Sequence, residues 1–137
     1  MKVHEHAIAD LNKVIEITPN DSEAYVLRAK MYHIQNKTDL AIVDCNHAIQ
    51  ANPRNIEAYA TKGHIYHKNK EFERALDEYN KVLQLDPSNM VVRANRCNAR
   101  YIYVQRSKNR ENFLEISALI NDAEELLKKQ KDYALVC

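Results

Sequence analysis

The three prolines of the chain, Pro19, Pro53 and Pro87, are spaced 34 residues apart. Proline has a fixed φ and no backbone N–H, so it marks helix ends at defined places. Other positions follow the same period: Ala7, Ala41 and Ala75; Asn12, Asn46 and Asn80; Tyr25 and Tyr59; Tyr32 and Tyr66; His33 and His67; Arg28, Lys62 and Arg96. A constant spacing of this kind predicts a repeated supersecondary unit.

Between these positions, apolar residues are spaced as on one face of a helix, and they do not alternate as in a strand. Each unit contains two such segments, 21–36 with 39–51 and then 55–69 with 71–85. The pattern therefore predicts an all-α chain of antiparallel helix pairs.

Two kinds of residue support the expected helix pairs. Asp21, Asn55 and Asn89 precede the first helix of each unit, where their side chains can accept hydrogen bonds from first-turn N–H groups. The small residues Ala29 and Gly63 follow a basic residue in each unit. We expect these small residues to let the two helices of a pair approach closely.

The repeated positions resemble the tetratricopeptide repeat, a helix–turn–helix unit of 34 residues. One copy reads Tyr25, Ala29, Tyr32, Ala41, Cys45, Ala48 and Pro53; the next reads Tyr59, Gly63, Tyr66, Ala75, Tyr79, Val82 and Pro87; a half copy, Ala7, Leu11, Val14 and Pro19, precedes them. The chain departs from the family pattern at Arg28 and Lys62, where leucine is usual, and at Arg93 and Arg100, where aromatic residues are expected.

The resemblance covers about residues 3–106 and implies an α–α superhelix, or solenoid, of about seven helices. The implied units are a half repeat with only its second helix (1–21), two repeats (22–55 and 56–89), and a divergent repeat with a C-terminal capping helix (90–137).

The balance of charge excludes some classes of partner. The 137 residues include 20 basic and 19 acidic side chains, for a net charge of +1. A nucleic-acid or membrane-surface binder would show a basic excess, so we expect neither partner. No segment approaches the ~20 apolar residues of a membrane span, and the N-terminus lacks the apolar core of a signal peptide.

The three cysteines, Cys45, Cys97 and Cys137, are an odd number without paired spacing. We interpret Cys45 and Cys97 as buried thiols in a reducing compartment, and Cys137 as a free terminal thiol. This favours a cytoplasmic protein.

Basic residues are concentrated between Arg93 and Arg110. The favoured interpretation is a solvated helix face followed by a connecting loop, because runs of charge are usually exposed. A site for an acidic partner is the alternative.

Both ends of the chain carry apolar faces. Residues 3–17 correspond to a second helix without its partner, so their apolar face favours a fragment of a longer array, or else a homodimer contact or an uncapped end. After a helix over about 90–106 and a turn at 107–109, the spacing of Phe113, Ile116, Ile120, Ala123 and Leu127 predicts an amphipathic helix to about Lys129. This helix is the second candidate for a homodimer contact.

No catalytic motif is present: the sequence has no P-loop, no GxSxG and no HExxH. His33, His64 and His67 are spaced so that they could face one groove and ligate a metal. No carboxylate or cysteine is spaced to complete the ligand shell. We therefore expect a protein that is not an enzyme and has no metal or cofactor.

In the family, the first helices of the repeats line a concave groove that receives a peptide or a helix. The resemblance places these residues in the groove: Glu23, Val26, Lys30 and His33; then Glu57, Ala60, His64 and His67; then Val91, Ala94, Asn95, Asn98 and Tyr101. Leu27 and Thr61 lie on the same stripe, and they and Ala94 can instead serve as spacers between helices.

The resemblance implies a protein–protein interaction module, a scaffold, adaptor or co-chaperone-like protein that binds a protein or peptide. The alternatives are structural self-association and an accessory domain of a larger protein. Family members that bind chaperone C-terminal carboxylates use a set of lysine, asparagine and arginine residues, of which only Asn95 matches here, so a ligand of that kind is not expected. Protonation of the histidines below about pH 6.5 would make the groove more basic.

Overall fold

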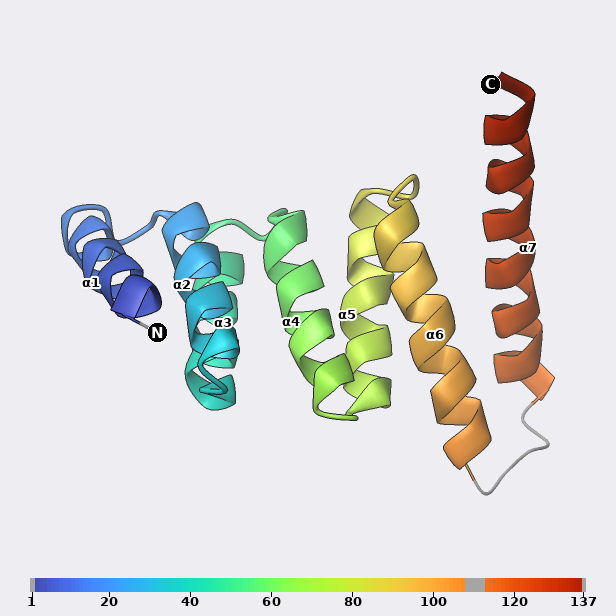
Figure 1. Ribbon diagram of the computed structural model, residues 1–137, viewed down its shortest axis with the longest axis horizontal. Helices are drawn as coiled ribbons and strands as arrows, with labels where there is room; N and C mark the ends of the chain where they lie inside the picture. Colours follow the sequence, from blue (N-terminus) through green and yellow to red (C-terminus); the bar gives the residue numbers. More distant parts are fainter. Residues whose placement is uncertain (1, 108–112, 137) are drawn as a thin grey trace.

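The structure, a computed structural model, describes residues 2–107 and 113–136. These residues form seven helices and no strand: α1 (Lys2–Ile17), α2 (Ser22–Ile34), α3 (Thr38–Ala51), α4 (Ile56–Lys68), α5 (Phe72–Leu85), α6 (Met90–Arg106) and α7 (Phe113–Val136). The helices follow one another along a single row, with α3 and α5 behind α2, α4 and α6 (Figure 1). The expected all-α solenoid is confirmed. Most of the turn expected at 107–109 lies outside the described residues.

Asparagine and aspartate caps start the first helix of each pair, as expected. The side chains of Asp21, Asn55 and Asn89 each accept a hydrogen bond of 3.1 Å from the N–H three residues later. A cap of this kind stabilises a helix by about 1 kcal/mol. The repeat therefore fixes the same entry point for α2, α4 and α6.

The turns inside the helix pairs repeat the same backbone conformation. Asn36, after α2, and Lys70, after α4, have φ values of 58° and 65°. Asparagine visits this left-handed region more readily than lysine does. Because both turns have this shape, α3 and α5 fold back on their partners in the same way.

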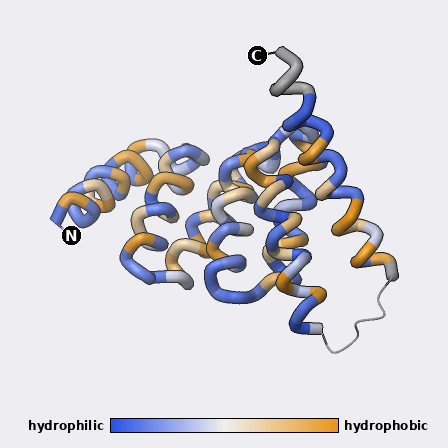
Figure 2. The backbone as a smooth tube through the Cα atoms, turned by 45° about the vertical axis from the view of Figure 1, so that its right-hand side comes forward, coloured by the Kyte–Doolittle hydropathy of each residue, from blue (hydrophilic) through white to orange (hydrophobic). Residues whose placement is uncertain are grey.

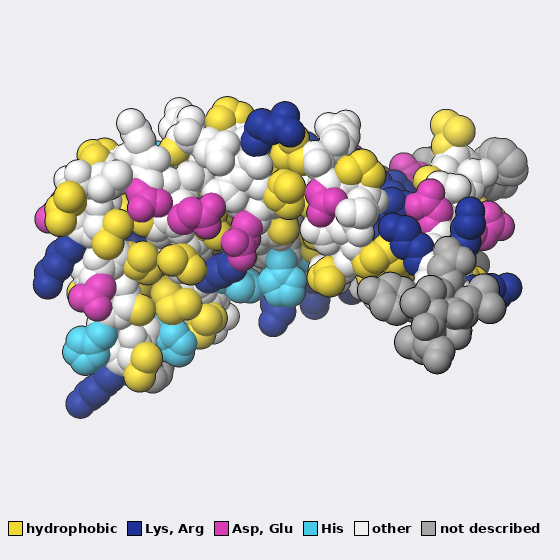
Figure 3. Space-filling view, turned by 90° about the horizontal axis from the view of Figure 1, so that it is seen from above, with side chains coloured by type: hydrophobic (Ala, Val, Ile, Leu, Met, Phe, Trp, Pro, Cys, Tyr) yellow, Lys and Arg dark blue, Asp and Glu magenta, His cyan; other side chains and the backbone are white. Residues whose placement is uncertain are grey.

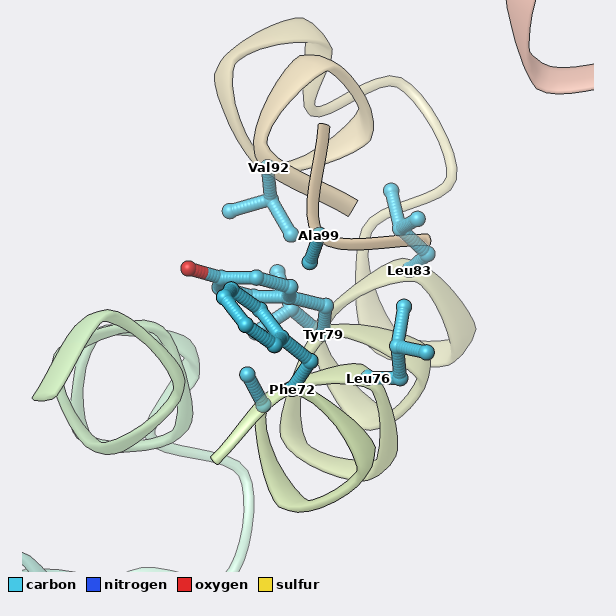
Figure 4. Close-up of a cluster of buried hydrophobic side chains, with 8 residues drawn as sticks. Phe72, Leu76, Tyr79, Leu83, Val92 and Ala99 are labelled. Atoms are coloured by element: carbon cyan, nitrogen blue, oxygen red, sulfur yellow. The ribbon is translucent and has the colours of Figure 1, made fainter. Parts of the chain in front are cut away.

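The largest core cluster lies where α5 meets α4 and α6. The Tyr79 ring is fully buried and lies between Phe72 and the α6 residues Val92 and Ala99 (Figure 4). On α4, a Cβ added at Gly63 would lie 2.6 Å from Cε1 of Tyr79. The ring therefore occupies the space that a side chain at position 63 would need.

The preceding repeat fills the same space with different residues. Ala29 aligns with Gly63 and Cys45 aligns with Tyr79, and both Ala29 and Cys45 are fully buried. One repeat thus places two small side chains, Ala29 and Cys45, at these positions. The next repeat has a glycine at one position and the large Tyr79 ring at the other. In each repeat the size of one residue limits the size of the other, because the contact is closely packed.

Gly63→Ala should therefore lower the free energy of unfolding by about 1–3 kcal/mol, because the methyl group overlaps the Tyr79 ring. The same change in a Tyr79→Cys background should be neutral or raise it by up to about 1 kcal/mol, since alanine is favoured over glycine in a helix. Urea denaturation of the wild type, the two single variants and the double variant tests whether the two positions are coupled. An equal loss in both backgrounds would contradict the steric explanation.

A basic residue on the first helix of each pair binds an acid on the second. Nε of Arg28 lies 2.7 Å from Asp44, and Nζ of Lys62 lies 3.1 Å from Glu78. In the last pair, Arg96 binds Asp122 of α7, with Nε 3.1 Å from Oδ2. The same cations reach back to the preceding repeat unit, because Arg28 donates to Asn12 at 2.7 Å and Arg96 donates to Asn80 at 2.9 Å.

The expected solvated basic face is wrong for the body of α6, although Arg106 is exposed; Lys108 and Arg110 lie outside the described residues. Arg93 and Arg100 are each 9% exposed, and they pair with acids of α7. Arg93 binds Glu125, and Arg100 binds both Asp122, at 2.5 Å, and Glu115, at 3.3 Å. These arginines stand where the family has aromatic residues, so ion pairs replace apolar packing between α6 and α7.

Helix α7 differs from the expected amphipathic helix in two ways. It continues to Val136, beyond the expected end near Lys129. Its predicted apolar face is also not the one that packs on α6, because Ile120 and Leu127 are 52% and 58% exposed. Hydrophobic residues nevertheless recur along the helix (Figure 2).

Helix α1 is the least buried of the row. None of its residues is buried, and Val14 and Ile17 are 39% and 83% exposed. Ala7, Ile8 and Leu11 are half-buried on the side where α1 packs on α2. The absence of a partner on the other side leaves part of the apolar face exposed, as the sequence indicated.

The two thiols within the described residues differ in burial. Cys45 is fully buried, and its burial raises the thiol pKa to about 12. Cys97 is only half-buried, contrary to our expectation. Cys137 lies outside the described residues.

Asp122→Asn should release α7 from α6. The variant removes the one carboxylate that the largely buried guanidinium groups of Arg96 and Arg100 share, and breaking a buried pair from one side costs about 3–5 kcal/mol. We expect faster amide hydrogen exchange over 114–131 than in the wild type. The matched control is Glu124→Gln, an exposed acid on the same helix. Equal exchange in the two variants would contradict the role of Asp122.

Candidate functional site

The face formed by α2, α4 and α6 contains a cavity of about 510 Å³. We call it the groove; its lining residues are Lys30, His33, Ile34, Glu57, Ala60, Thr61, His64, Val91, Val92 and Asn95. The capped starts of the three helices set them in equivalent positions, so side chains one repeat apart face the same space. In the view from above, histidine side chains lie along the lower edge of the molecule, and the α1 end projects below the rest of that edge (Figure 3).

The groove brings together seven of the residues that the sequence placed there. They come from three helices and are Lys30, His33, Glu57, Ala60, His64, Val91 and Asn95. Thr61, weighed as a spacer, also lines the groove. Ile34 and Val92 were missed, although Ile34 follows Lys30 by one helical turn and this spacing could have identified it.

Two predicted groove residues lie elsewhere. Val26 is fully buried and packs with Ala48 and Ala58, because α2 turns this side of the helix toward α3 and α4. His67 turns toward α5, where its Nδ1 lies 3.3 Å from the Tyr79 hydroxyl and its ring meets Phe72 edge-on. The assignment of both residues to the groove was wrong.

The other four predicted residues are exposed beyond the cavity. Ala94, Asn98 and Tyr101 lie along α6, and Tyr101 is 53% exposed. Glu23 lies at the start of α2, where Asn55 donates a 3.4 Å hydrogen bond to its carboxylate. A ligand longer than the cavity would reach these positions.

The charges of the groove largely cancel. Nζ of Lys30 forms an ion pair with Glu57 across the gap between α2 and α4. No other lysine, arginine, aspartate or glutamate is among the described lining residues. The rest of the wall is apolar or uncharged, so the cavity favours an apolar ligand surface.

His33 and His64 lie against each other in the groove, with ring centroids 5.6 Å apart in an edge-on arrangement. Burial lowers the pKa of both rings. The nearby charge of Lys68 lowers each pKa further, and His33 does the same for His64. Both rings are therefore more strongly neutral near pH 7 than a free histidine.

The part of the chain that the structure describes offers no group of three or more histidine, cysteine or acidic side chains that could hold a metal. The three histidines considered as ligands do not converge, because His67 points away. None of the described helices combines the length and the apolar character that crossing a membrane requires. What the groove can do chemically is bind a ligand through shape and apolar contact.

Nuclear magnetic resonance titration should show His33 and His64 with pKa values below the ordinary 6.5. Lys68→Gln should raise both, because one repulsive charge is removed, whereas Lys13→Gln on α1 should change neither. In the unfolded chain these two histidines bind protons at a higher pH than in the folded chain. The contribution of these rings to stability is therefore complete above pH 6.5 and falls as the pH drops below it. Unchanged titration in Lys68→Gln would contradict the assigned cause.

Two family models match the chain. Both are described as tetratricopeptide repeat, and they match residues 56–89 and 11–43. No curated protein sequence matches the chain.

Solved structures of similar fold were found in several proteins. One is the first TPR of Spaghetti (RPAP3) bound to the HSP90 peptide SRMEEVD, with a TM-score of 0.71 and 24% identity over 75% of this chain and 82% of that one. MamA gives a TM-score of 0.78 with 20% identity over 96% of this chain and 66% of that one. The Arabidopsis OM64 TPR domain gives a TM-score of 0.68 with 20% identity over 73% of this chain and 83% of that one. These similarities establish a shared fold.

Proposed function

The chain is a member of the tetratricopeptide-repeat family, and we propose that it is a non-enzymatic adaptor or scaffold that holds a peptide or helix of a partner protein in the groove. The observation that carries the proposal is a cavity of about 510 Å³ whose one ion pair is satisfied within the protein. Ligand sites are typically concave and mostly apolar, with a few polar groups that fix orientation.

The charges of the groove distinguish this proposal from a co-chaperone that binds acidic chaperone tails. The similar TPR domain of RPAP3 was solved with the peptide SRMEEVD, which contains two glutamates and one aspartate. Here Lys30 is the one lysine among the described lining residues, and Glu57 already neutralises it. An acidic peptide would have to displace Glu57, so we propose a ligand that presents apolar side chains.

The histidines make the proposed binding depend on pH. Protonation of His33 and His64 adds positive charge beside the apolar wall, which disfavours an apolar ligand. We propose that affinity for such a ligand falls between pH 8 and pH 5.5. Equal affinity at both values would contradict this role for the histidines. The buried free thiol of Cys45 supports a reducing compartment, and we propose the cytoplasm.

Variants of the groove should weaken peptide binding. We would select binders from a displayed library of random peptides and measure their affinities by calorimetry. Ala60→Glu and Val91→Glu each bury a charge under the ligand and should weaken binding at least tenfold. Leu40→Glu is the matched control, because Leu40 is 47% exposed on α3, away from the groove, and should change affinity less than twofold. Binders that are insensitive to both groove variants would overturn the proposal.

A further inference from the structure

Helix α7 carries an apolar stripe of which two members are exposed and two are half-buried. The stripe consists of Ile116, Ile120, Ala123 and Leu127, spaced four, three and four residues apart, so its members share one helix face. Ile120 and Leu127 are more than half exposed. A helix of this pattern ordinarily buries its stripe against a partner.

The ion pairs with α6 determine which way α7 faces. Glu115, Asp122 and Glu125 share a second face of the helix, and all three bind arginines of α6. Asp122 is 1% exposed and binds two of them. Turning the stripe toward α6 would move Asp122 out of its site and leave Arg96 and Arg100 without their shared carboxylate. The stripe is therefore held away from α6.

The groove has the chemistry to receive such a stripe. An amphipathic helix binds a hydrophobic groove through anchors at i, i+3 or i+4, and i+7, which is the spacing of the stripe. The groove presents Ile34, Ala60 and Val91, and its Lys30–Glu57 ion pair requires no charge from the ligand.

Charges at the edges of the two surfaces are complementary in one orientation. Exposed Lys128 and Lys131 flank the C-terminal part of the stripe, and exposed Glu124 precedes them by at least one turn. On α4, exposed Glu57 is near the start of the helix and exposed Lys68 is at its end. A helix antiparallel to α4 therefore brings Glu124 toward Lys68, while the two lysines lie at the Glu57 end of the groove, where Glu57 stays paired with Lys30.

We propose that the stripe of one copy of the chain docks in the groove of a second copy, antiparallel to α4. The proposal rests on the function proposed for the groove. Helix α7 lies beyond α6, at the end of the row opposite α1 (Figure 1). While Asp122 holds it there, the stripe cannot enter the groove of its own chain. A second copy meets no such restriction.

Light-scattering chromatography from about 10 μM to 1 mM tests the proposal. The mass of the wild type should rise above the 16.0 kDa of one chain, whereas Ile120→Glu and Val91→Glu should each stay at 16.0 kDa. Leu114→Glu is the matched control, because Leu114 is 78% exposed on the same helix but on a different face, and it should associate like the wild type.

The decisive step mixes the two inactive variants. Val91→Glu keeps its stripe and Ile120→Glu keeps its groove, so an equal mixture should form a one-to-one complex of twice the single-chain mass. A wild type of constant mass up to 1 mM would overturn the proposal, and so would a mixture that stays monomeric. Association lost in Ile120→Glu but kept in Val91→Glu would indicate contact between two stripes and would also overturn it.

The same variants separate this inference from the function proposed for the groove. If the selected peptides bind the groove while the wild type stays monomeric, the groove binds ligands but not the stripe. If neither peptides nor the stripe depend on Val91, both proposals fail. Association abolished by Val14→Glu, and by neither of the other two variants, would place the contact on α1 and overturn the inference.

Discussion

The structure depends on one interaction that recurs along the chain: a cation on the first helix of a pair binds an acid on the second. This ion pair occurs in three successive helix pairs, as Arg28 with Asp44, Lys62 with Glu78 and Arg96 with Asp122. The acids are nearly inaccessible, at 2%, 5% and 1% exposed. A buried acid without its cation is costly, so each pair excludes arrangements in which its helices shift or rotate relative to each other. Apolar packing stabilises the row, whereas the ion pairs fix its register.

This use of charge explains how a nearly neutral chain with many ionisable residues can present a groove of low charge. Arg93, Arg96 and Arg100 of α6 form ion pairs with acids of α7, and Lys30 forms one with Glu57. The groove is then lined by apolar residues, two histidines, Thr61, Asn95 and one ion pair closed within the protein. The same ion pairs leave the apolar stripe of α7 exposed, because a helix that turns its acids inward must turn another face outward.

Much of the fold could be predicted from the sequence because it repeats. The prolines, the Asx caps and the small residue Gly63 between two close helices each act locally or within one period, and the structure confirms them. The position of Asp122 could not be predicted from the period, which would have placed the acid near residue 112. Helix α6 has 17 residues where α4 has 13, so the chain reaches the same point in space later in the sequence. Val26 and His67 were assigned wrongly because a helical stripe is wider than the part of it that faces the groove.

The contrast with RPAP3 shows how far the fold limits the ligand. Two domains of the same architecture can present the same row of helices, yet the ligand responds to the few side chains on it. In the present chain, an acidic ligand that binds Lys30 would leave Glu57 without its partner. An apolar helix gains the area of Ile34, Ala60 and Val91 without disturbing any ion pair. We therefore propose that the groove favours apolar ligands, since each buried methylene contributes about 0.8 kcal/mol and no charge has to be separated from its partner. We therefore propose that the Lys30–Glu57 ion pair, which joins α2 to α4, also limits which ligands the groove binds.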